Sequence, residues 1–306
     1  MAVNLGISNI STVKLGAADV SKIYLGSDIV FGGASFDPFA QAFIDAHEAN
    51  TGLPMGIVQR DTINNTTALL RGIGTTNGTD FIGNDLLYRW QCYCPIDDST
   101  ANPAAYEMDL INPSVKHSFI NLSSSLYDPT GMQILGGVGR GIDSMFNPFT
   151  DASPTDFTFG YDFKTSITAP INPIGSRGSG IDQYTTTVFS SGRLLSGIAE
   201  TANTSNFTYS NNPAGFLNVT VSGTTKKVWL NGALLNTITR TGTSFYNGNI
   251  AFQSCNLLGT IGGGTSTVDS RLCIGSFLAK GFSDAQATDF NEVWSYYQSN
   301  IITGGR

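Results

Sequence analysis

The segment Lys226-Lys227-Val228-Trp229-Leu230-Asn231-Gly232-Ala233-Leu234-Leu235 decides the fold of this chain. Two runs that are rich in apolar residues flank the dipeptide Asn231-Gly232. Asn-Gly is the sequence that a two-residue type I′ turn favours, because both central residues of that turn need a positive φ. The segment therefore predicts a β-hairpin.

The same pattern continues on both sides of this hairpin. Short runs rich in β-branched and aromatic residues alternate with turn signals such as Asn112-Pro113, Asp128-Pro129 and Ser222-Gly223. We expect strands over 106–110, 117–122, 132–135, 157–163, 185–189, 193–198, 216–221, 226–230, 234–239, 249–253 and 271–277. Many short strands at this spacing predict a mainly β protein, a two-sheet antiparallel β-sandwich.

Helices are predicted before and after the sandwich. Asp37 is a suitable N-cap and Pro38 suits the first helical position, while Gly52 ends that helix. Its expected apolar face is Phe39, Ala42, Phe43 and Ala46. A second helix is expected within 57–71 and a third short helical or mixed segment over 81–90. The last helix, 283–301, begins at Ser283 with Gln286 completing a capping box, and its apolar stripe is Ala287, Phe290, Val293, Trp294 and Tyr297.

The N-terminus holds a threefold repeat with a ten-residue period, over 3–10, 13–20 and 23–30. Each unit has a β-branched residue, any residue, Leu and Gly, then a polar turn and Ile or Val. One unit is too short to bury its apolar residues, so it must stack on its siblings or on a partner. Two interpretations stay open: a β-meander that covers its own domain, and an anchoring module. The candidate anchor residues are Leu5, Gly6, Leu15, Gly16, Tyr24, Leu25 and Gly26.

These patterns divide the chain into a repeat module over 1–31, a small-residue hinge over 32–35 and a body over 36–306. The body comprises a helical leader (36–90), the sandwich (91–282) and the C-terminal helix (283–301). Charged residues are only 13%, the net charge is −7 and the isoelectric point is near 4.7. An acidic chain with scattered basic residues argues against nucleic-acid binding. No apolar run is long enough for a membrane span, and no secretory signal is visible.

Catalytic signals are sparse. A glycan hydrolase needs a pair of carboxylates, and Glu107-Met108-Asp109 is the one alternating acidic pair on a predicted strand. No Gly-x-Ser-x-Gly elbow precedes a helix, and the chain has two histidines. A zinc site at Cys92 and Cys94 would need two further ligands, so buried free thiols are the alternative. We therefore expect no hydrolytic site, no enzyme, no metal site and no cofactor.

Sugar binding needs an exposed aromatic ring near amides or carboxylates. The candidates are Tyr184, Tyr209 and Tyr246, which lie among Asn and Asp in predicted loops. The alternative places these tyrosines at the rim of the sandwich or in a subunit contact. Asp182 and Asp269 could ligate calcium, although no loop shows regularly spaced acidic ligands.

The order of these parts resembles bacteriophage virion proteins that carry a concanavalin A-like (laminin-G-like) β-sandwich. The resemblance rests on the Ile-Tyr-Leu-Gly-Ser repeat at 23–27, on 36–44, on Gly139-Arg140-Gly141 leading to Asn147-Pro148, and on 228–232 with Ile274-Gly275 and the helix after Phe282. It spans nearly the whole chain, but no single motif is specific. Members of this fold class include lectins, glycan hydrolases and structural modules.

The resemblance implies a structural protein of the virion surface, either a head fibre or decoration protein or a tail component, made in the cytoplasm of the bacterial host. Its N-terminal module would bind other virion proteins. Sheet edges with few charges favour a homo-oligomer, and the resemblance puts a trimer before a dimer. The alternatives are a carbohydrate-binding protein that recognises a host surface glycan through the sandwich loops and, after that, a glycan depolymerase.

Overall fold

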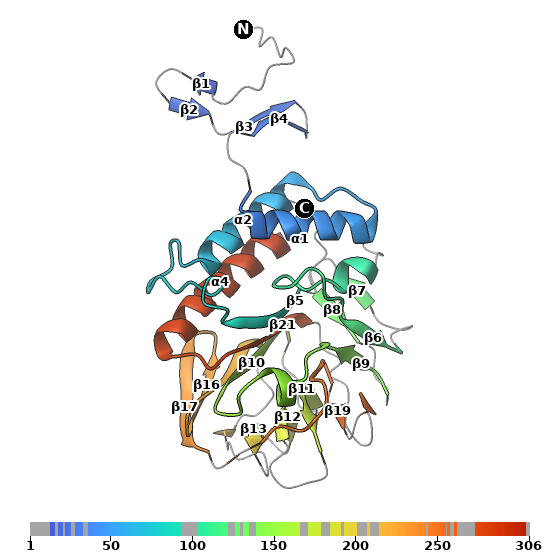
Figure 1. Cartoon of the computed structure of the whole chain (residues 1–306), viewed down its shortest axis with the longest axis vertical. Coiled ribbons are helices and arrows are strands. Elements are labelled where there is room, and N and C mark those ends of the chain that lie inside the picture. The colour runs from blue at the N-terminus through green and yellow to red at the C-terminus, as the bar shows by residue number, and fades with distance from the viewer. Residues whose placement is uncertain are drawn as a thin grey trace.

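Three layers build the body of the protein: a layer of helices and two β-sheets that pack face to face (Figure 1). The fold is a mainly β sandwich of antiparallel sheets, as predicted from the sequence. The computed structural model describes residues 13–15, 18–20, 22–25, 28–32, 36–92, 103–121, 126–128, 131–134, 139–165, 171–178, 184–190, 193–200, 207–208, 214–240, 242, 244–254, 256–257, 260–261 and 273–303.

Sheet 1 lies next to the helices. Its strands, in spatial order, are β17 (Ala233–Thr239), β16 (Thr225–Leu230), β15 (Gly215–Ser222), β10 (Asp156–Phe163), β21 (Cys273–Ala279), β8 (Gly131–Gln133) and β7 (Leu126–Asp128), and β5 (Leu87–Cys92) also pairs with β21. The predicted hairpin is the β16–β17 connection. Leu230 pairs with Ala233, and Asn231 and Gly232 have φ values of 50° and 77°, as a type I′ turn requires.

Sheet 2 forms the other half of the sandwich. Its order is β14 (Phe207–Thr208), β13 (Arg193–Glu200), β12 (Tyr184–Ser190), β11 (Ile171–Arg177), β18 (Ala251–Phe252), β9 (Gly141–Asp143) and β6 (Ser118–Ile120). The short strands β19 (Asn256–Leu257) and β20 (Thr260–Ile261) pair beside β11, where β19 runs parallel to it.

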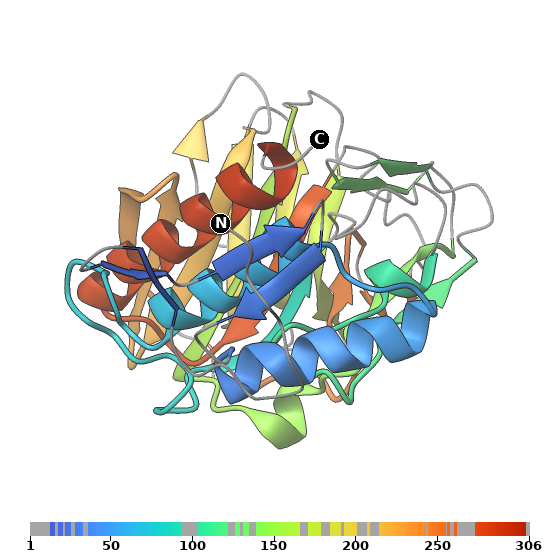
Figure 2. The same cartoon turned by 90° about the horizontal axis from the view of Figure 1, so that it is seen from above.

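The helices are α1 (Pro38–Thr51), α2 (Ile57–Leu70), the single turn α3 (Pro148–Asp151) and α4 (Asp284–Thr303), together with the 3₁₀ turn η1 (Pro103–Tyr106). Figure 2 shows α4 lying across the strands below it, and α2 packs against both α4 and α1. The predicted caps are confirmed. Asp37 Oδ1 accepts from Phe39 N at 2.8 Å, Gly52 takes φ 71°, and Ser283 and Gln286 form the capping box.

The central strands of sheet 1, β10 and β21, are buried on both of their faces. One core cluster fills the sandwich and includes Phe157, Phe159, Val219, Val228 and Phe252. The other lies between sheet 1 and the helices and includes Phe43, Ile63, Trp90, Phe277, Phe290 and Trp294. The whole predicted stripe of α4 is buried in this second cluster. The buried face of α1 is instead Ala40, Phe43, Ile44 and His47, and Ala42 is exposed.

Two predicted elements differ from the structure. The sequence predicts a short helical or mixed segment over 81–90, whereas in the structure this segment ends in strand β5. The pairing register with β21 shifts at Tyr88, so Tyr88 and Trp90 face different sides: the Tyr88 ring stacks on Phe146 at 4.8 Å, whereas Trp90 packs under the helices. The strand expected over 106–110 is replaced by η1 and the isolated bridges Met108–Lys116 and Gln91–Asp109. Both differences arise because an apolar run fits either structure until tertiary packing selects one.

The N-terminal repeat forms hairpins where it is described. The second and third units are β1 (Val13–Leu15) with β2 (Ala18–Val20), and β3 (Lys22–Leu25) with β4 (Asp28–Gly32). Leu15, Tyr24 and Leu25 lie on these strands, whereas Leu5, Gly6, Gly16 and Gly26 lie outside the described residues. Among the described residues, neither core cluster of the body contains one before Phe36.

An ion pair lies inside the sandwich and links its two sheets. Lys226 Nζ of β16 is 2.6 Å from Glu200 Oε2 of β13 and donates to Ser196 O at 2.8 Å. Both side chains are almost fully buried. Burial lowers the pKa of Lys226, and the Glu200 carboxylate opposes that shift. Removal of either partner would leave a buried charge unpaired, so a single substitution at Lys226 or Glu200 should destabilise the sandwich.

A second buried contact joins α4 to sheet 1. Trp294 Nε1 donates to Asp162 Oδ2 of β10 at 2.7 Å, and both side chains are within 1% of complete burial. Desolvation raises the pKa of Asp162 from 3.8 to about 6, although the Trp294 hydrogen bond and Lys164 act in the other direction. Ionisation of Asp162 is therefore less favourable in the folded protein than in the unfolded chain.

Asp162 should make stability fall as pH rises. Its folded pKa lies above its unfolded value, so its stabilising contribution is present below about pH 4 and lost as pH rises through about 6. Asp162→Asn keeps an oxygen for Trp294 without the charge. We expect the variant to gain up to ~3 kcal/mol over wild type between pH 4 and 7, measured by urea unfolding. The exposed Asp45→Asn is the control, and parallel pH curves for wild type and Asp162→Asn would contradict this assignment.

Candidate functional site

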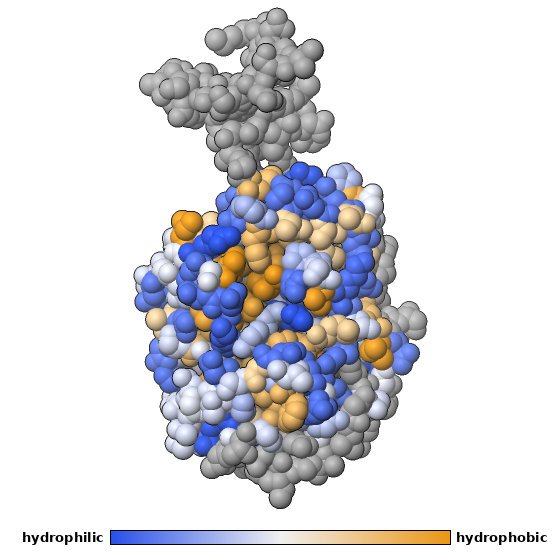
Figure 3. Space-filling view, viewed as in Figure 1, coloured by the Kyte–Doolittle hydropathy of each residue, from blue (hydrophilic) through white to orange (hydrophobic). Residues whose placement is uncertain are grey.

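The outer strands of sheet 1 present a regular array of polar side chains on the helix side. Val219 and Val221 of β15 and Val228 of β16 point into the sandwich, so the residues between them point the other way. Strand register then aligns two rows: Ser222, Thr225 and Thr239 form one, and Thr220, Lys227 and Thr237 form the other. We call these six residues the hydroxyl platform. Figure 3 shows pale, weakly hydrophilic atoms over the lower left, where Figure 1 places β16 and β17.

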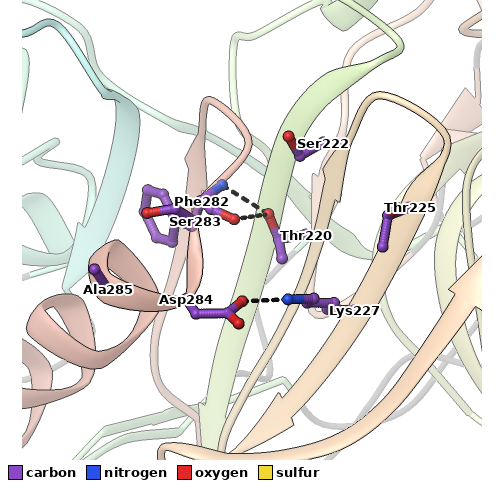
Figure 4. Close-up of a pocket in the computed structure, with 8 residues that line it drawn as sticks. All are labelled: Thr220, Ser222, Thr225, Lys227, Phe282, Ser283, Asp284 and Ala285. Carbon is purple, nitrogen blue, oxygen red and sulfur yellow. Dashed lines mark hydrogen bonds and ion pairs between the residues drawn. The ribbon is translucent and has the colours of Figure 1, made fainter.

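An open pocket of about 520 Å³ lies where this platform meets the start of α4 (Figure 4). Its platform side is Thr220, Ser222, Thr225 and Lys227, and its other wall is Phe282, Ser283, Asp284 and Ala285. Lys227 and Asp284 point toward each other and form an ion pair. Their side chains are 25% and 60% exposed, so both remain accessible to a ligand.

Thr220 holds the floor of the pocket in place. Its Oγ1 accepts from Phe282 N at 2.7 Å and from the Thr158 hydroxyl at 2.7 Å. The N-terminus of α4 is closed by its capping box, in which Ser283 N donates to Gln286 Oε1 at 2.8 Å. The polarity of the pocket therefore comes from side-chain hydroxyls, one ammonium and one carboxylate. These groups donate and accept hydrogen bonds at close spacing, which suits a ligand rich in hydroxyl groups.

Of the tyrosines predicted to bind glycan, Tyr246 is not among the described residues that line this pocket. Tyr184 begins β12 of sheet 2, opposite Arg177 and Glu200, and Tyr209 lies outside the described residues. Tyr246 is partly exposed in the loop before β18, and its ring lies against Gly248. The neighbouring Asn247 accepts from Asn147 Nδ2 at 2.8 Å.

The platform was missed from the sequence, although a signal is present. Valine alternates with hydroxyl residues in Val219-Thr220-Val221-Ser222, and Thr225 and Lys227 continue the alternation on the next strand. Alternation of this kind shows that one face of a strand is polar. It does not show that α4, about sixty residues further along the chain, closes one side of that face.

The acidic pair at Glu107 and Asp109 does not have the geometry expected of two carboxylates on one strand face. The Asp109 side chain is fully buried, and its Oδ1 accepts from Ile111 N and Asn112 N, each at 2.8 Å. Its Oδ2 lies 3.2 Å from His117 Nε2, which is also buried. Glu107 is half-buried, and its carbonyl accepts from His117 N. Asp109 therefore organises a buried turn.

No family model matches the chain, and no curated protein is similar to it in sequence. Three solved structures illustrate the likeness of the fold. A Trypanosoma rangeli sialidase mutant displaying trans-sialidase activity is 15% identical with a TM-score of 0.46, over 78% of this chain and 38% of that one. Domain 4 of the arabinanase AbnA from Geobacillus stearothermophilus, in complex with arabinotriose, is 14% identical with a TM-score of 0.44, over 67% and 97%. The binding domain of botulinum neurotoxin serotype D is 13% identical with a TM-score of 0.42, over 69% and 51%.

The expectation that the chain is not an enzyme is contradicted by these comparisons, because the matched structures include sialidases, which are enzymes. The chain spans 38% of the length of the first of these sialidases. The likenesses concern the fold, and they assign no substrate or site to this chain. Within the described ranges, no helix is long and apolar enough to cross a bilayer, and no three His, Cys, Asp or Glu side chains gather as metal ligands would.

Proposed function

We propose that this chain is a glycan-binding protein whose sugar site is the pocket between the hydroxyl platform and α4. The observation that carries the proposal is the lining of that pocket: hydroxyls from adjacent strands together with the solvent-accessible Lys227–Asp284 pair. Its volume of about 520 Å³ lies within the range of small-molecule sites. Sugar hydroxyls can take hydrogen bonds from the ammonium and give them to the carboxylate, and charged partners make these bonds strong.

Lys227→Met and Thr225→Val should each weaken glycan binding by the purified full chain. Each variant removes polar atoms and keeps a similar side-chain shape. Loss of a hydrogen bond to a charged group costs about 1.5–3 kcal/mol, so Lys227→Met should raise the dissociation constant about 10- to 100-fold. Thr225→Val should have a smaller effect of about tenfold or less. A panel of purified bacterial surface polysaccharides is first screened for ligands of the wild-type chain. The dissociation constants of those ligands are then measured by calorimetry.

Thr150→Val, an exposed change on α3, is the matched control and should bind as wild type does. Tyr246→Ala tests the other location, because it removes the partly exposed ring beside Asn247. Loss of binding in Tyr246→Ala with normal binding in Lys227→Met would contradict the pocket as the site. Failure of the wild-type chain to bind any polysaccharide would contradict the proposed function. After the wild-type chain has been incubated with each polysaccharide, analysis of the polysaccharide for shortened glycans measures cleavage directly.

We further propose that the N-terminal repeat anchors the protein in a bacteriophage virion, at the particle surface. The support is the sequence resemblance together with the hairpins β1–β2 and β3–β4, which are drawn away from the layered body in Figure 1. Hairpins of this size do not bury enough surface to be stable alone. Partner strands from virion proteins or from copies of the repeat would complete them.

Deletion of residues 1–31 should leave a folded body that no longer enters phage particles. Both described core clusters lie within 36–303, so the deletion removes none of their residues. Circular dichroism and glycan binding should match those of the full chain. The measurement is the amount of this protein in purified particles, by immunoblot, and normal incorporation of the shortened chain would refute the anchoring role.

A further inference from the structure

Strand β17 forms one edge of sheet 1. It pairs with β16 on one side, and among the described residues no strand pairs with its other side. Figures 1 and 2 both show β17 at the margin of the body. All seven of its residues are exposed or half-buried, and Leu234 is 44% exposed. A free edge of this length presents a row of backbone donors and acceptors to another chain.

The sequence of β17, Ala-Leu-Leu-Asn-Thr-Ile-Thr, has little of the usual protection against such pairing. It contains no proline and no charged residue, and these residues protect natural edges. One irregularity lies at Val228/Trp229 of the pairing with β16, near the start of β17. Further along β17, the Thr237 N–H has an acceptor in the neighbouring Asn236 Oδ1 at 2.8 Å. The side chain of the preceding residue therefore accepts the hydrogen bond from this backbone N–H of the edge strand.

We infer that β17 pairs antiparallel with β17 of a second copy of this chain. Antiparallel pairing of one strand with itself is symmetric about a twofold axis perpendicular to the sheet, so both copies use the same surface. Because the strand carries no charge, no register of this pairing places like charges opposite each other. The exposed Leu234 side chains would lose contact with water in such a dimer.

The pairing has a geometric consequence for the hydroxyl platform. A twofold axis perpendicular to the sheet keeps the same face of sheet 1 on the same side in both copies. The two platforms would then lie side by side, with Thr237 and Thr239 of each copy next to the junction. The inference that β17 pairs with itself does not depend on the proposed glycan function. Only the use of the two adjoining platforms as one glycan-binding surface rests on that function.

The test is the molar mass of the purified full chain by light scattering. Asn236→Lys places an ammonium in the middle of the strand, where two copies would repel each other. Thr237→Pro removes the N–H that Asn236 now accepts and prevents its use by another strand. Each variant should have half the molar mass of wild type under the same conditions.

Two controls match these changes. Asn236→Gln keeps a neutral amide at the same position, and Ala49→Lys adds the same charge on the exposed face of α1. Both should keep the wild-type mass. Equal masses for wild type, Asn236→Lys and Thr237→Pro would overturn the inference, whether that common mass is the monomer or an oligomer. Loss of mass in Asn236→Gln or Ala49→Lys as well would also overturn it, because the effect would not be specific to a charged or blocked edge.

Discussion

The packing of Trp294 against sheet 1 is the interaction on which the rest of this structure depends. Its ring stacks on Trp90 at 5.1 Å and on Phe216 at 4.6 Å, and its Nε1 donates to Asp162. Gly275 of β21 makes room for it, since a Cβ there would lie 2.8 Å from Trp294 Cη2. One side chain of α4 thus contacts or constrains β5, β10, β15 and β21. The docked helix covers one face of the central strands of sheet 1, and sheet 2 covers their other face.

The same docking produces the candidate site. Phe282, just before α4, is held by Thr220 and packs its ring on Phe277 and Phe290. The first turn of the helix therefore stands beside β15 and β16, and the helix covers only part of sheet 1. Strands β15, β16 and β17 carry the hydroxyl platform beside the start of the helix. The position of α4 thus determines both the covered, apolar part of the sheet and the polar part that a ligand can reach.

Local patterns predicted the elements whose signals are contained in a few residues. The Asn231-Gly232 turn, the cap at Asp37 and the stripe from Ala287 to Tyr297 needed only turn chemistry and periodicity. The sequence predicts a helical or mixed segment where β5 lies, because Leu86, Leu87 and Trp90 suit a helix as well as a strand. Its strand conformation comes from pairing with β21, which lies far along the chain.

The candidate site was harder to predict because register and docking create it. Thr220 and Lys227 are neighbours only through the pairing of β15 with β16, and Asp284 reaches Lys227 only after α4 docks. Asp109 illustrates the opposite case. Its spacing from Glu107 suggested a shared strand face, but local backbone donors and His117 bury it. Spacing along the sequence says which side chains share a face only when the element has been identified correctly.

The free energy of unfolding of Trp294→Ala, measured by urea denaturation beside wild type, tests the central role of this side chain. A tryptophan that is 1% exposed and stacked between two rings should cost about 3–5 kcal/mol when truncated. Ala46→Ser, a partly buried change on α1, is a control that should stay within about 1 kcal/mol of wild type. A Trp294→Ala variant as stable as that control would contradict the account that the docking of α4 organises the fold.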